Sequence, residues 1–235
     1  MHRPPDVQSF AADAPVWPAP NGRRVVFLLD AASRLEERLL TTWIERHRPP
    51  EVAPAQVEAI HVPSSRRQPR QRRIDARLEA CLATDDDSLF APLRIAWQPP
   101  QRDGARAVRL PDLLTFGDPR DPGRLRQAWV LRRHPDRCCI VVGEPAPASE
   151  LRTRWQRVCG TDVAQTTGLA EFVTRQATLA LERAERRLRG TRYKVPRLVH
   201  EEILARPGFR GALTRLAREL GRSEARVTRQ ASRYL

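Results

Sequence analysis

Residues 24–47 read RVVFLLDAASRLEERLLTTWIERH, and this stretch contains a predicted strand followed directly by a predicted helix. Its first part, Arg24–Leu29, is a short apolar run rich in β-branched residues and predicts a buried strand. A strand followed at once by an amphipathic helix is the start of an α/β unit. Ser33 can cap the helix, Pro49 ends it, and the apolar residues between them recur at helical spacing: Leu35, Leu39, Leu40, Trp43 and Ile44.

Three more apolar runs predict strands, and two of the intervening segments predict helices. The strands are Val57–Val62, Pro92–Trp97 and Arg137–Val142. The helices are Ile74–Leu82 and Ser149–Val158, and we expect Ser149 to be the N-cap of the second. Residues 24–160 are therefore predicted to form an α/β region of four short strands, whose order is left open. Residues 1–23 are rich in proline and aperiodic, so we expect a flexible leader there.

From residue 166 onward the sequence pattern is helical. Apolar residues at three- and four-residue spacing run along 169–189, and arginines and glutamates occupy the other face. This stripe either packs into the protein's own core, which we favour, or lies on an anionic membrane. Further helices are expected from Pro196, over Phe209–Leu220 and from Ser223 to Leu235. The fold class is thus α/β, with a short-stranded amino-terminal α/β region followed by an all-helical carboxyl-terminal region over 166–235.

The chain is strongly basic, with 42 lysine and arginine residues against 28 aspartates and glutamates, or a net charge of +14. Such an excess is typical of proteins that bind nucleic acid or anionic lipid. However, Lys194 is the only lysine and Asn21 the only asparagine, a bias that a GC-rich coding sequence produces without any binding requirement. The net charge is +6 over 1–160 and +8 over 161–235, so the last third is the more basic part.

Several classes of protein are excluded by what the sequence lacks. The longest aliphatic runs, Val25–Leu29 and Cys138–Val142, span five residues each, whereas a membrane-spanning helix needs about twenty. The proline-rich start has no apolar core of a secretory signal. Without such a signal, we expect reduced, partly buried thiols at the four cysteines and no zinc site, since none form a C-x-x-C pair: Cys81, Cys138, Cys139 and Cys159.

No catalytic motif is visible, and we assign no catalytic, cofactor-binding or metal-binding residue. The sequence contains neither a glycine-rich nucleotide loop nor a G-x-S-x-G elbow. Asp85–Asp87 can bind a divalent cation in principle, but we favour a solvated turn. The Arg66–Arg77 run holds six arginines, which either bind phosphate or form an exposed loop, the reading we favour. The histidines are isolated, and we expect solvated or capping roles for them: His2, His47, His61, His134 and His200.

One local pattern is typical of a DNA-binding helix-turn-helix. Leu216-Ala217, Leu220-Gly221 and Val227 have the spacing of two helices joined by a glycine turn. In that arrangement the groove of DNA would be faced by three arginines, Arg222, Arg226 and Arg229. The same spacing describes an ordinary helical hairpin. A regulator that uses residues 210–235 is therefore the alternative hypothesis, and nucleic acid is not the partner we expect.

A longer stretch resembles a known enzyme family. The basic helix ends in LRGTRYKVP (188–196), continues as RLVHEEIL (197–204) and leads into Phe209 and the helix that includes 213–220. These residues are similar to the segment before the catalytic domain of bacterial glycerol-3-phosphate 1-O-acyltransferases, relatives of dihydroxyacetone-phosphate acyltransferase. The similarity covers 166–235 well. It is patchy over 24–160, where VVFLL (25–29) with its helix and LRIAW (93–97) fit the family.

The resemblance implies transfer of an acyl group from acyl-CoA or acyl carrier protein to the sn-1 hydroxyl of glycerol 3-phosphate, which gives lysophosphatidate. In the family a histidine of an H-x-x-x-x-D motif is the general base, at the cytoplasmic face of the bacterial membrane. No histidine here has aspartate five residues later; Val7, Val52, Arg66, Cys139 and Ala205 stand there instead.

We therefore expect an amino-terminal portion of such an enzyme that is inactive alone, needs no cofactor and is a fragment of a longer protein. Its expected partners are a downstream acyltransferase domain of the same protein and an anionic membrane surface, to which the chain would bind peripherally. Acyl donor and glycerol 3-phosphate would be bound only by the full-length enzyme.

Overall fold

The computed structural model describes residues 15–64, 74–102, 105–106, 118–159, 168–189 and 207–231. The chain divides into two compact units. The first unit comprises Met1–Ala96 and Arg124–Leu188, and the second comprises Trp97–Gly123 and Arg189–Leu235. The α/β fold class predicted from the sequence is confirmed, because a mixed sheet with helices is followed by helices at the carboxyl end.

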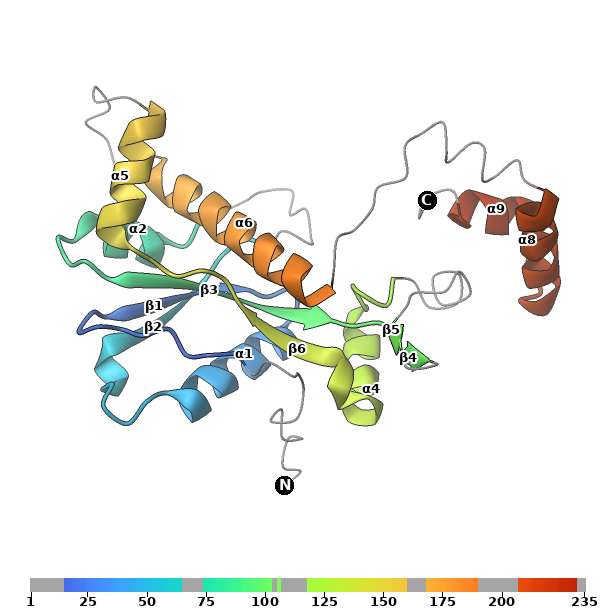
Figure 1. Ribbon diagram of the computed structural model, residues 1–235, viewed down its shortest axis with the longest axis horizontal. Helices are drawn as coiled ribbons and strands as arrows, with labels where there is room; N and C mark the ends of the chain where they lie inside the picture. The colour runs from blue at the N-terminus through green and yellow to red at the C-terminus, as the bar shows by residue number, and fades with distance from the viewer. Residues whose placement is uncertain are drawn as a thin grey trace. The chain divides into compact units, whose positions relative to one another are not determined.

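The first unit is built on a five-stranded sheet whose path runs β2-β1-β3-β6 (Figure 1). Strand β1 (Val25–Asp30) pairs in parallel with β2 (Val57–His61) on one side and with β3 (Leu89–Trp97) on the other. Strands β6 (Cys138–Val142) and β7 (Ala146–Pro147) both neighbour β3, and β7 is antiparallel to it. The predicted strand runs at 24–29, 57–62 and 137–142 are all strands in the structure, with ends shifted by one residue.

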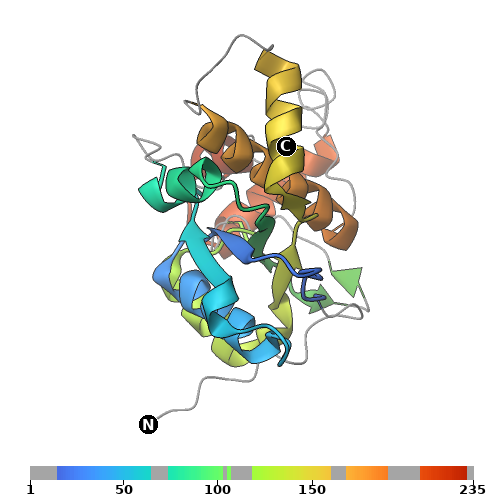
Figure 2. The same cartoon turned by 90° about the vertical axis from the view of Figure 1, so that its left-hand side faces the viewer.

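Helices cover both faces of this sheet, as Figures 1 and 2 show. On one face α2 (Ala76–Ala83), α5 (Ala148–Cys159) and α6 (Leu169–Arg189) pack over Val26 and Leu28. On the other face, α1 (Arg34–His47) and α4 (Arg124–Arg133) lie side by side. Trp43 of α1 contacts Phe27 of β1 there, with ring centroids 6.4 Å apart. Because both faces are covered, every residue of β1 is buried, as its continuous apolar run predicted.

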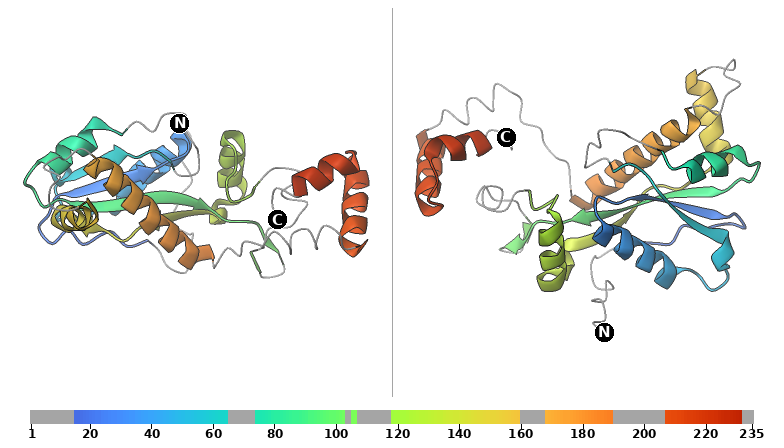
Figure 3. Two further views of the ribbon diagram at one scale, coloured as in Figure 1. Left: turned by 90° about the horizontal axis from the view of Figure 1, so that it is seen from above. Right: turned by 180° about the vertical axis from the view of Figure 1, so that it is seen from behind.

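The helix α1 begins and ends where the sequence indicates. The Ser33 side chain accepts a hydrogen bond from the backbone N–H of Glu36, so the predicted N-cap is confirmed. Helix α6 spans the predicted residues, and most of its apolar stripe packs on the sheet, as predicted for a core helix, whereas Leu188 near its end is 36% exposed. Figure 3 shows α6 crossing over the strands of its own unit.

Strand β3 begins at Leu89, three residues before the predicted start at Pro92. Proline disfavours central strands because it has no backbone N–H to donate. Here Pro92 lies opposite the interruption between β6 and β7, where its carbonyl accepts a hydrogen bond from Gly143 N–H at 2.8 Å. The irregular neighbouring chain thus accommodates the proline within the strand.

The prediction that Ser149 caps α5 is wrong. The helix already begins at Ala148, and the backbone N–H of Ser149 donates to Asp87 Oδ1 at 2.8 Å. A carboxylate that is distant in sequence therefore satisfies this free N–H group at the start of the helix, in place of a local side chain. Helix α2 is capped locally, since Asp75 accepts from Arg77 N–H.

In the second unit, β4 (Gln101–Arg102) and β5 (Ala105–Arg106) form an antiparallel pair, and α8 (Pro207–Glu219) is followed by α9 (Glu224–Ala231). The turn between the two helices places Gly221 at φ +59°, a conformation that favours glycine. In the described part of the first unit, Pro54–Gln56 and Pro135–Arg137 form short 3₁₀ helices. Among the described helices, none has both the length and the apolar character needed to cross a bilayer.

Candidate functional site

The first place to look for a site is where the strand order reverses. The connection from β1 to β2 and that from β2 to β3 run in opposite directions across the sheet, so the reversal lies between β1 and β3. Open α/β sheets commonly bind ligands beyond the carboxyl ends of the strands at such a point. In this chain Asp30 ends β1, and Arg94 is its register partner on β3.

A buried ion cluster occupies this position. The Arg94 guanidinium donates to Asp30 Oδ2 through Nε at 2.9 Å and to Glu185 Oε2 of α6 through Nη1, also at 2.9 Å. The Arg94 and Asp30 side chains are only 3% and 1% exposed. Burial alone would lower the pKa of Arg94, but the two carboxylates outweigh it and raise that pKa. Arg94 therefore keeps its charge, and its bonds tie β1, β3 and α6 together.

A second polar network fills the start of α1. The Ser33 hydroxyl donates to Gln127 Oε1 of α4 at 2.5 Å, and Gln127 Nε2 donates to Glu36 Oε1 at 3.0 Å. Glu36 Oε2 accepts from the backbone N–H of Ala32 at 2.7 Å. Glu36 and Gln127 are fully buried. Because the polar groups around the strand reversal bond to one another, we place no ligand there.

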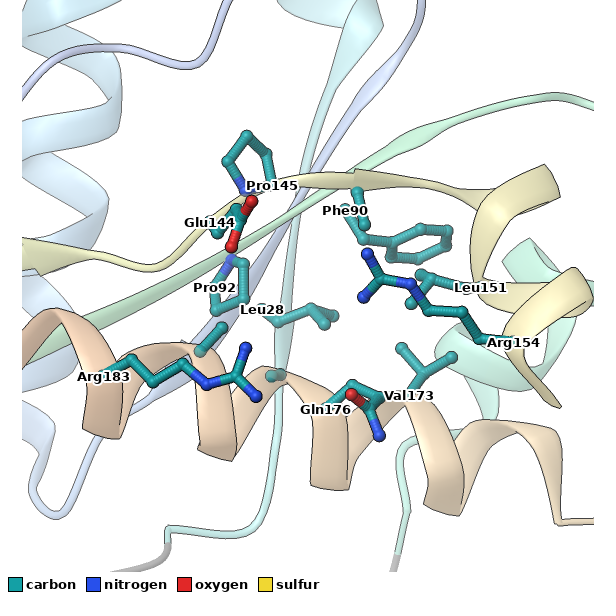
Figure 4. A pocket seen from close by; sticks show the side chains of 13 residues that line it. Leu28, Phe90, Pro92, Glu144, Pro145, Leu151, Arg154, Val173, Gln176 and Arg183 are labelled. Carbon is teal, nitrogen blue, oxygen red and sulfur yellow. The ribbon is translucent and has the colours of Figure 1, made fainter. Parts of the chain in front are cut away.

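A pocket lies on the face of the sheet that α6 covers. A cavity of about 40 Å³ is enclosed by the start of β7, α5 and α6 over β1 and β3 (Figure 4). Its floor is apolar and includes Leu28, Phe90 and Val173. Figure 4 shows the side chains of Arg154 and Arg183 entering from opposite sides, with polar groups completing the rim: Arg154, Gln176, Arg183 and Glu144.

The hollow continues along β6 and the second half of α6. This larger part has a volume of about 560 Å³ and is lined by Pro15 and Val16, by residues 140–145 and by five residues of α6: Ala180, Arg183, Ala184, Arg187 and Leu188. It shares Ala180 and Arg183 with the smaller cavity and adds Arg187. We call the two parts together the α6 groove.

Gly143 lies where the two parts of the α6 groove adjoin. A Cβ atom placed on Gly143 would lie 3.1 Å from Pro92 Cβ and 3.2 Å from Ala180 Cβ. Such distances are shorter than ordinary carbon–carbon contacts. Glycine therefore lets α6 approach the end of β6 this closely, and a Cβ here would push Pro92 or Ala180 away by a few tenths of an ångström.

The charges along the groove are unevenly balanced. Arg154 already pairs with Glu150 at 2.5 Å, and Glu185 pairs with the buried Arg94. Glu182 lies 4.0 Å from Arg186, on another part of the helix surface. Arg183 and Arg187, four residues apart on α6, have no carboxylate partner among the described residues. A single acidic side chain, Glu144, lines the described groove, which is therefore suited to an anion.

The histidines that the structure describes are not part of a catalytic arrangement. His47 Nδ1 lies 3.0 Å from the Trp43 carbonyl oxygen, and His61 Nε2 lies 3.2 Å from Glu37 Oε1 at the surface. The His134 ring packs edge-on against Trp129. His2 and His200 lie outside the described residues.

The remaining candidates from the sequence are the Asp85–Asp87 run, the Arg66–Arg77 run and the cysteines, and the structure describes part of each. Asp87 of the Asp85–Asp87 run bonds to Arg23 at 3.0 Å and to Ser149, and no group of three metal-ligand side chains occurs among the described residues. Most of the Arg66–Arg77 run, residues 66–73, lies outside the described chain.

Cys81, Cys138 and Cys139 are buried free thiols, as expected, and burial raises the pKa of Cys81. The side chain of Cys159 is not described.

No protein-family model matches the chain, and no solved structure matches it significantly. Function must therefore be argued from the residues and their arrangement.

Proposed function

We propose that this chain is the amino-terminal, non-catalytic part of a glycerol-3-phosphate 1-O-acyltransferase. The whole enzyme would transfer an acyl group from acyl-CoA or acyl carrier protein to glycerol 3-phosphate and release lysophosphatidate. The observation that carries the proposal is the resemblance of residues 166–235, above all LRGTRYKVPRLVHEEIL (188–204), to the segment that precedes the catalytic domain in that family. The α/β fold followed by helices is compatible with the same assignment.

The proposal gives this part of the enzyme an architectural role. The chain has no H-x-x-x-x-D sequence, so the proton transfer from the glycerol 3-phosphate hydroxyl belongs to a downstream acyltransferase domain. What the chain offers is a rigid sheet with helices that can pack against that domain. The second part of the proposed role is to seat the enzyme on the anionic cytoplasmic surface of the bacterial membrane.

Helix α4 supports the proposed contact with a membrane. Leu125 is 91% exposed and Trp129, one turn later, is 53% exposed. The helix carries four arginines and no acidic residue, and three of these arginines are exposed: Arg124, Arg132 and Arg133. Apolar and tryptophan side chains flanked by arginine are typical of helices that lie in the interface of an anionic bilayer. We call Leu125, Trp129 and these three arginines the α4 face.

Flotation with lipid vesicles tests the membrane contact. The chain should bind vesicles of phosphatidylcholine with about 30% phosphatidylglycerol, and binding should weaken as salt rises. Replacing Leu125 and Trp129 together by alanine should lower the partition coefficient at least about tenfold, because burying either side chain contributes about 1.5–3 kcal/mol. Val158→Ala on α5 is the control, since Val158 is 71% exposed but lies outside the α4 face. Equal loss with the control would contradict the proposal.

An activity assay tests the enzyme assignment itself. The product of the complete gene should convert glycerol 3-phosphate and acyl-CoA to lysophosphatidate, whereas residues 1–235 alone should not. Replacing the histidine of the downstream H-x-x-x-x-D motif should abolish the conversion. A reading frame in which that motif is absent from every intact copy would end the proposal.

A DNA-binding regulator is the second candidate, because α8, the Gly221 turn and α9 have helix-turn-helix spacing (Figure 3). Ala217 and Val227 are buried between the two helices, while Arg226 and Arg229 are exposed on α9. Duplex DNA binding with both base preference and a steep salt dependence would favour this function. Changing Arg226 and Arg229 to glutamine should then remove it, with Arg175→Gln on α6 as the control.

A further inference from the structure

We propose that the α6 groove binds an anionic amphiphile, namely a single alkyl chain with a phosphate or carboxylate head. This inference rests on the groove alone. It would survive failure of the acyltransferase assignment, because it is argued from the lining and charge of the groove and not from the resemblance, and because no groove residue belongs to the α4 face.

The wall of the larger part of the groove suits an alkyl chain. It is formed by side chains that carry no polar group and are only partly covered: Ile140, Val142, Ala180, Ala184 and Leu188. The two alanines on α6 leave a channel between the helix and the sheet edge, since their side chains are short. Its volume of about 560 Å³ falls within the range of about 300–1,000 Å³ that small-molecule sites occupy. A bound chain would cover apolar surface that now faces water.

Arg183 and Arg187 provide the anion-binding end. A guanidinium group binds carboxylate or phosphate oxygens through two parallel N–H donors. Two arginines four residues apart on one helix repel each other slightly, and an anion between them removes that repulsion. The helix does not supply such an anion itself, because Glu185 bonds to Arg94 and Glu182 lies by Arg186.

The helix dipole explains only one of these two arginines. Cations are favoured in the last turn of a helix, which in α6 includes Arg187 but not Arg183. Arg183 lies farther back and lines both parts of the groove. Figure 4 shows its side chain extending along α6 below Pro92, toward Gln176. We therefore place the anionic head beside Arg183 and the alkyl chain along β6 toward Leu188.

Isothermal titration calorimetry with four probes tests this site. Dodecyl phosphate and dodecanoate have alkyl chains of similar length but different head groups, and both are used below their critical micelle concentrations. We expect at least one of them to bind saturably, at one molecule per protein molecule. Their relative affinities tell whether the site prefers phosphate or carboxylate. Inorganic phosphate supplies the head without the chain, and dodecyltrimethylammonium supplies the chain with the opposite charge. Both of these should bind at least about tenfold more weakly.

Variants locate the binding in the groove. Arg183→Gln with Arg187→Gln should weaken dodecyl phosphate at least tenfold, whereas Arg175→Gln, an exposed arginine of α6 outside the groove, should not. Leu188→Glu places a negative charge at the apolar wall and should weaken binding as well. All these side chains are exposed, so the fold is expected to persist, and circular dichroism checks that it does.

The proposal is overturned by any of three results. Equal loss with Arg175→Gln would mean attraction to overall charge, and equal binding of dodecyltrimethylammonium would mean attraction to any alkyl chain. Failure of both anionic probes to bind saturably would mean that the groove holds no such ligand.

Discussion

Arg94 is buried in the first unit, and its charge is paired with two carboxylates from other elements. It is the register partner of Asp30 across β1 and β3, and it reaches Glu185 on α6. A buried arginine without partners would be strongly destabilising, because water no longer solvates the ion. With two carboxylates from two different elements, the cluster fixes how α6 lies on the two central strands.

Arg94→Met should lower the free energy of unfolding by about 3–5 kcal/mol, because Asp30 would remain as a buried charge without its partner. Methionine keeps much of the volume, so the loss measures the charge rather than a cavity. Urea unfolding gives the value. Arg154→Met is the control, since it breaks the exposed pair with Glu150 and should cost less than about 1 kcal/mol. Similar losses in both variants would show that the buried cluster stabilises the fold no more than the exposed Arg154–Glu150 pair does.

Asp87 links three segments through one carboxylate. The backbone N–H of Ser149 is the main reason that the pKa of Asp87 is below its ordinary value of 3.8, and Arg23 adds to the effect. A lowered pKa in the folded state means that the ionised carboxylate stabilises the fold above about pH 3.8, and that this contribution disappears as pH falls through the lower folded value.

Asp87→Asn should therefore destabilise the chain at neutral pH, and the difference from the unaltered chain should shrink only below pH 3.8. Urea unfolding at intervals between pH 7 and pH 2.5 measures this difference. Asp85→Asn serves as the matched control, because Asp85 is an exposed member of the same run. If the difference for Asp87→Asn stayed constant through the acid range, the carboxylate would not be the stabilising group.

At the scale of elements, the close approach of α6 to the end of β6 depends on Gly143. Replacing Gly143 by alanine should lower the free energy of unfolding by about 1–3 kcal/mol, because the added methyl group overlaps Pro92 and Ala180. Thermal or urea unfolding measures it. Gly123→Ala is the control, as a Cβ at Gly123 meets nothing within 4 Å. A neutral Gly143→Ala would mean that α6 shifts without cost.

Elements with a strong hydrophobic period could be predicted from the sequence, and those defined by distant contacts could not. The unbroken run of β1 predicts a strand and the apolar stripe of α6 predicts a helix, and the ends of both elements were predicted within one residue. The first residues of β3 were missed because proline is expected at the start of a strand and not within it, until the position of Pro92 beside the β6–β7 interruption is known. Helix α4 was missed because RLRQAWVLRR, with its four arginines, has no clear apolar stripe.

The α6 groove could not be predicted from the sequence, because it too depends on contacts between distant residues. Arg183 and Arg187 are four residues apart, which is visible in the sequence, but many surface helices have such pairs. What distinguishes them is that Glu185 turns inward to Arg94 and that β6 lies beside Ala180 and Ala184. Both facts depend on tertiary packing, whereas helical spacing alone places Arg183 and Arg187 on a solvated face.

At the scale of the whole molecule, the two units differ greatly in the cores they contain. The first unit has a sheet with buried side chains on both faces. In the second unit, the described core of α8 and α9 consists of five buried residues: Leu213, Leu216, Ala217, Val227 and Ala231. A core of this size contributes much less hydrophobic stabilisation than the sheet does.

Hydrogen exchange should therefore separate the two units. We expect backbone amides of β1 and β3 to exchange at least about ten times more slowly than those of α8 and α9. Leu213→Ala should increase exchange in α8 and α9 and leave β1 unchanged, as followed by mass spectrometry of peptic peptides. Faster exchange in β1 as well would mean that both units unfold as one.

The hydrogen bonds of Gln127 have a mechanical consequence. Gln127 lies on the buried side of α4 and joins both Ser33 and Glu36, the residues that start α1, while Leu125 and Trp129 project outward from the same helix. A lateral force on the outer side of α4 would thus be carried by Gln127 into α1 and the end of β1. A force applied at the surface of α4 would therefore be transmitted to β1, which lies inside the sheet between β2 and β3.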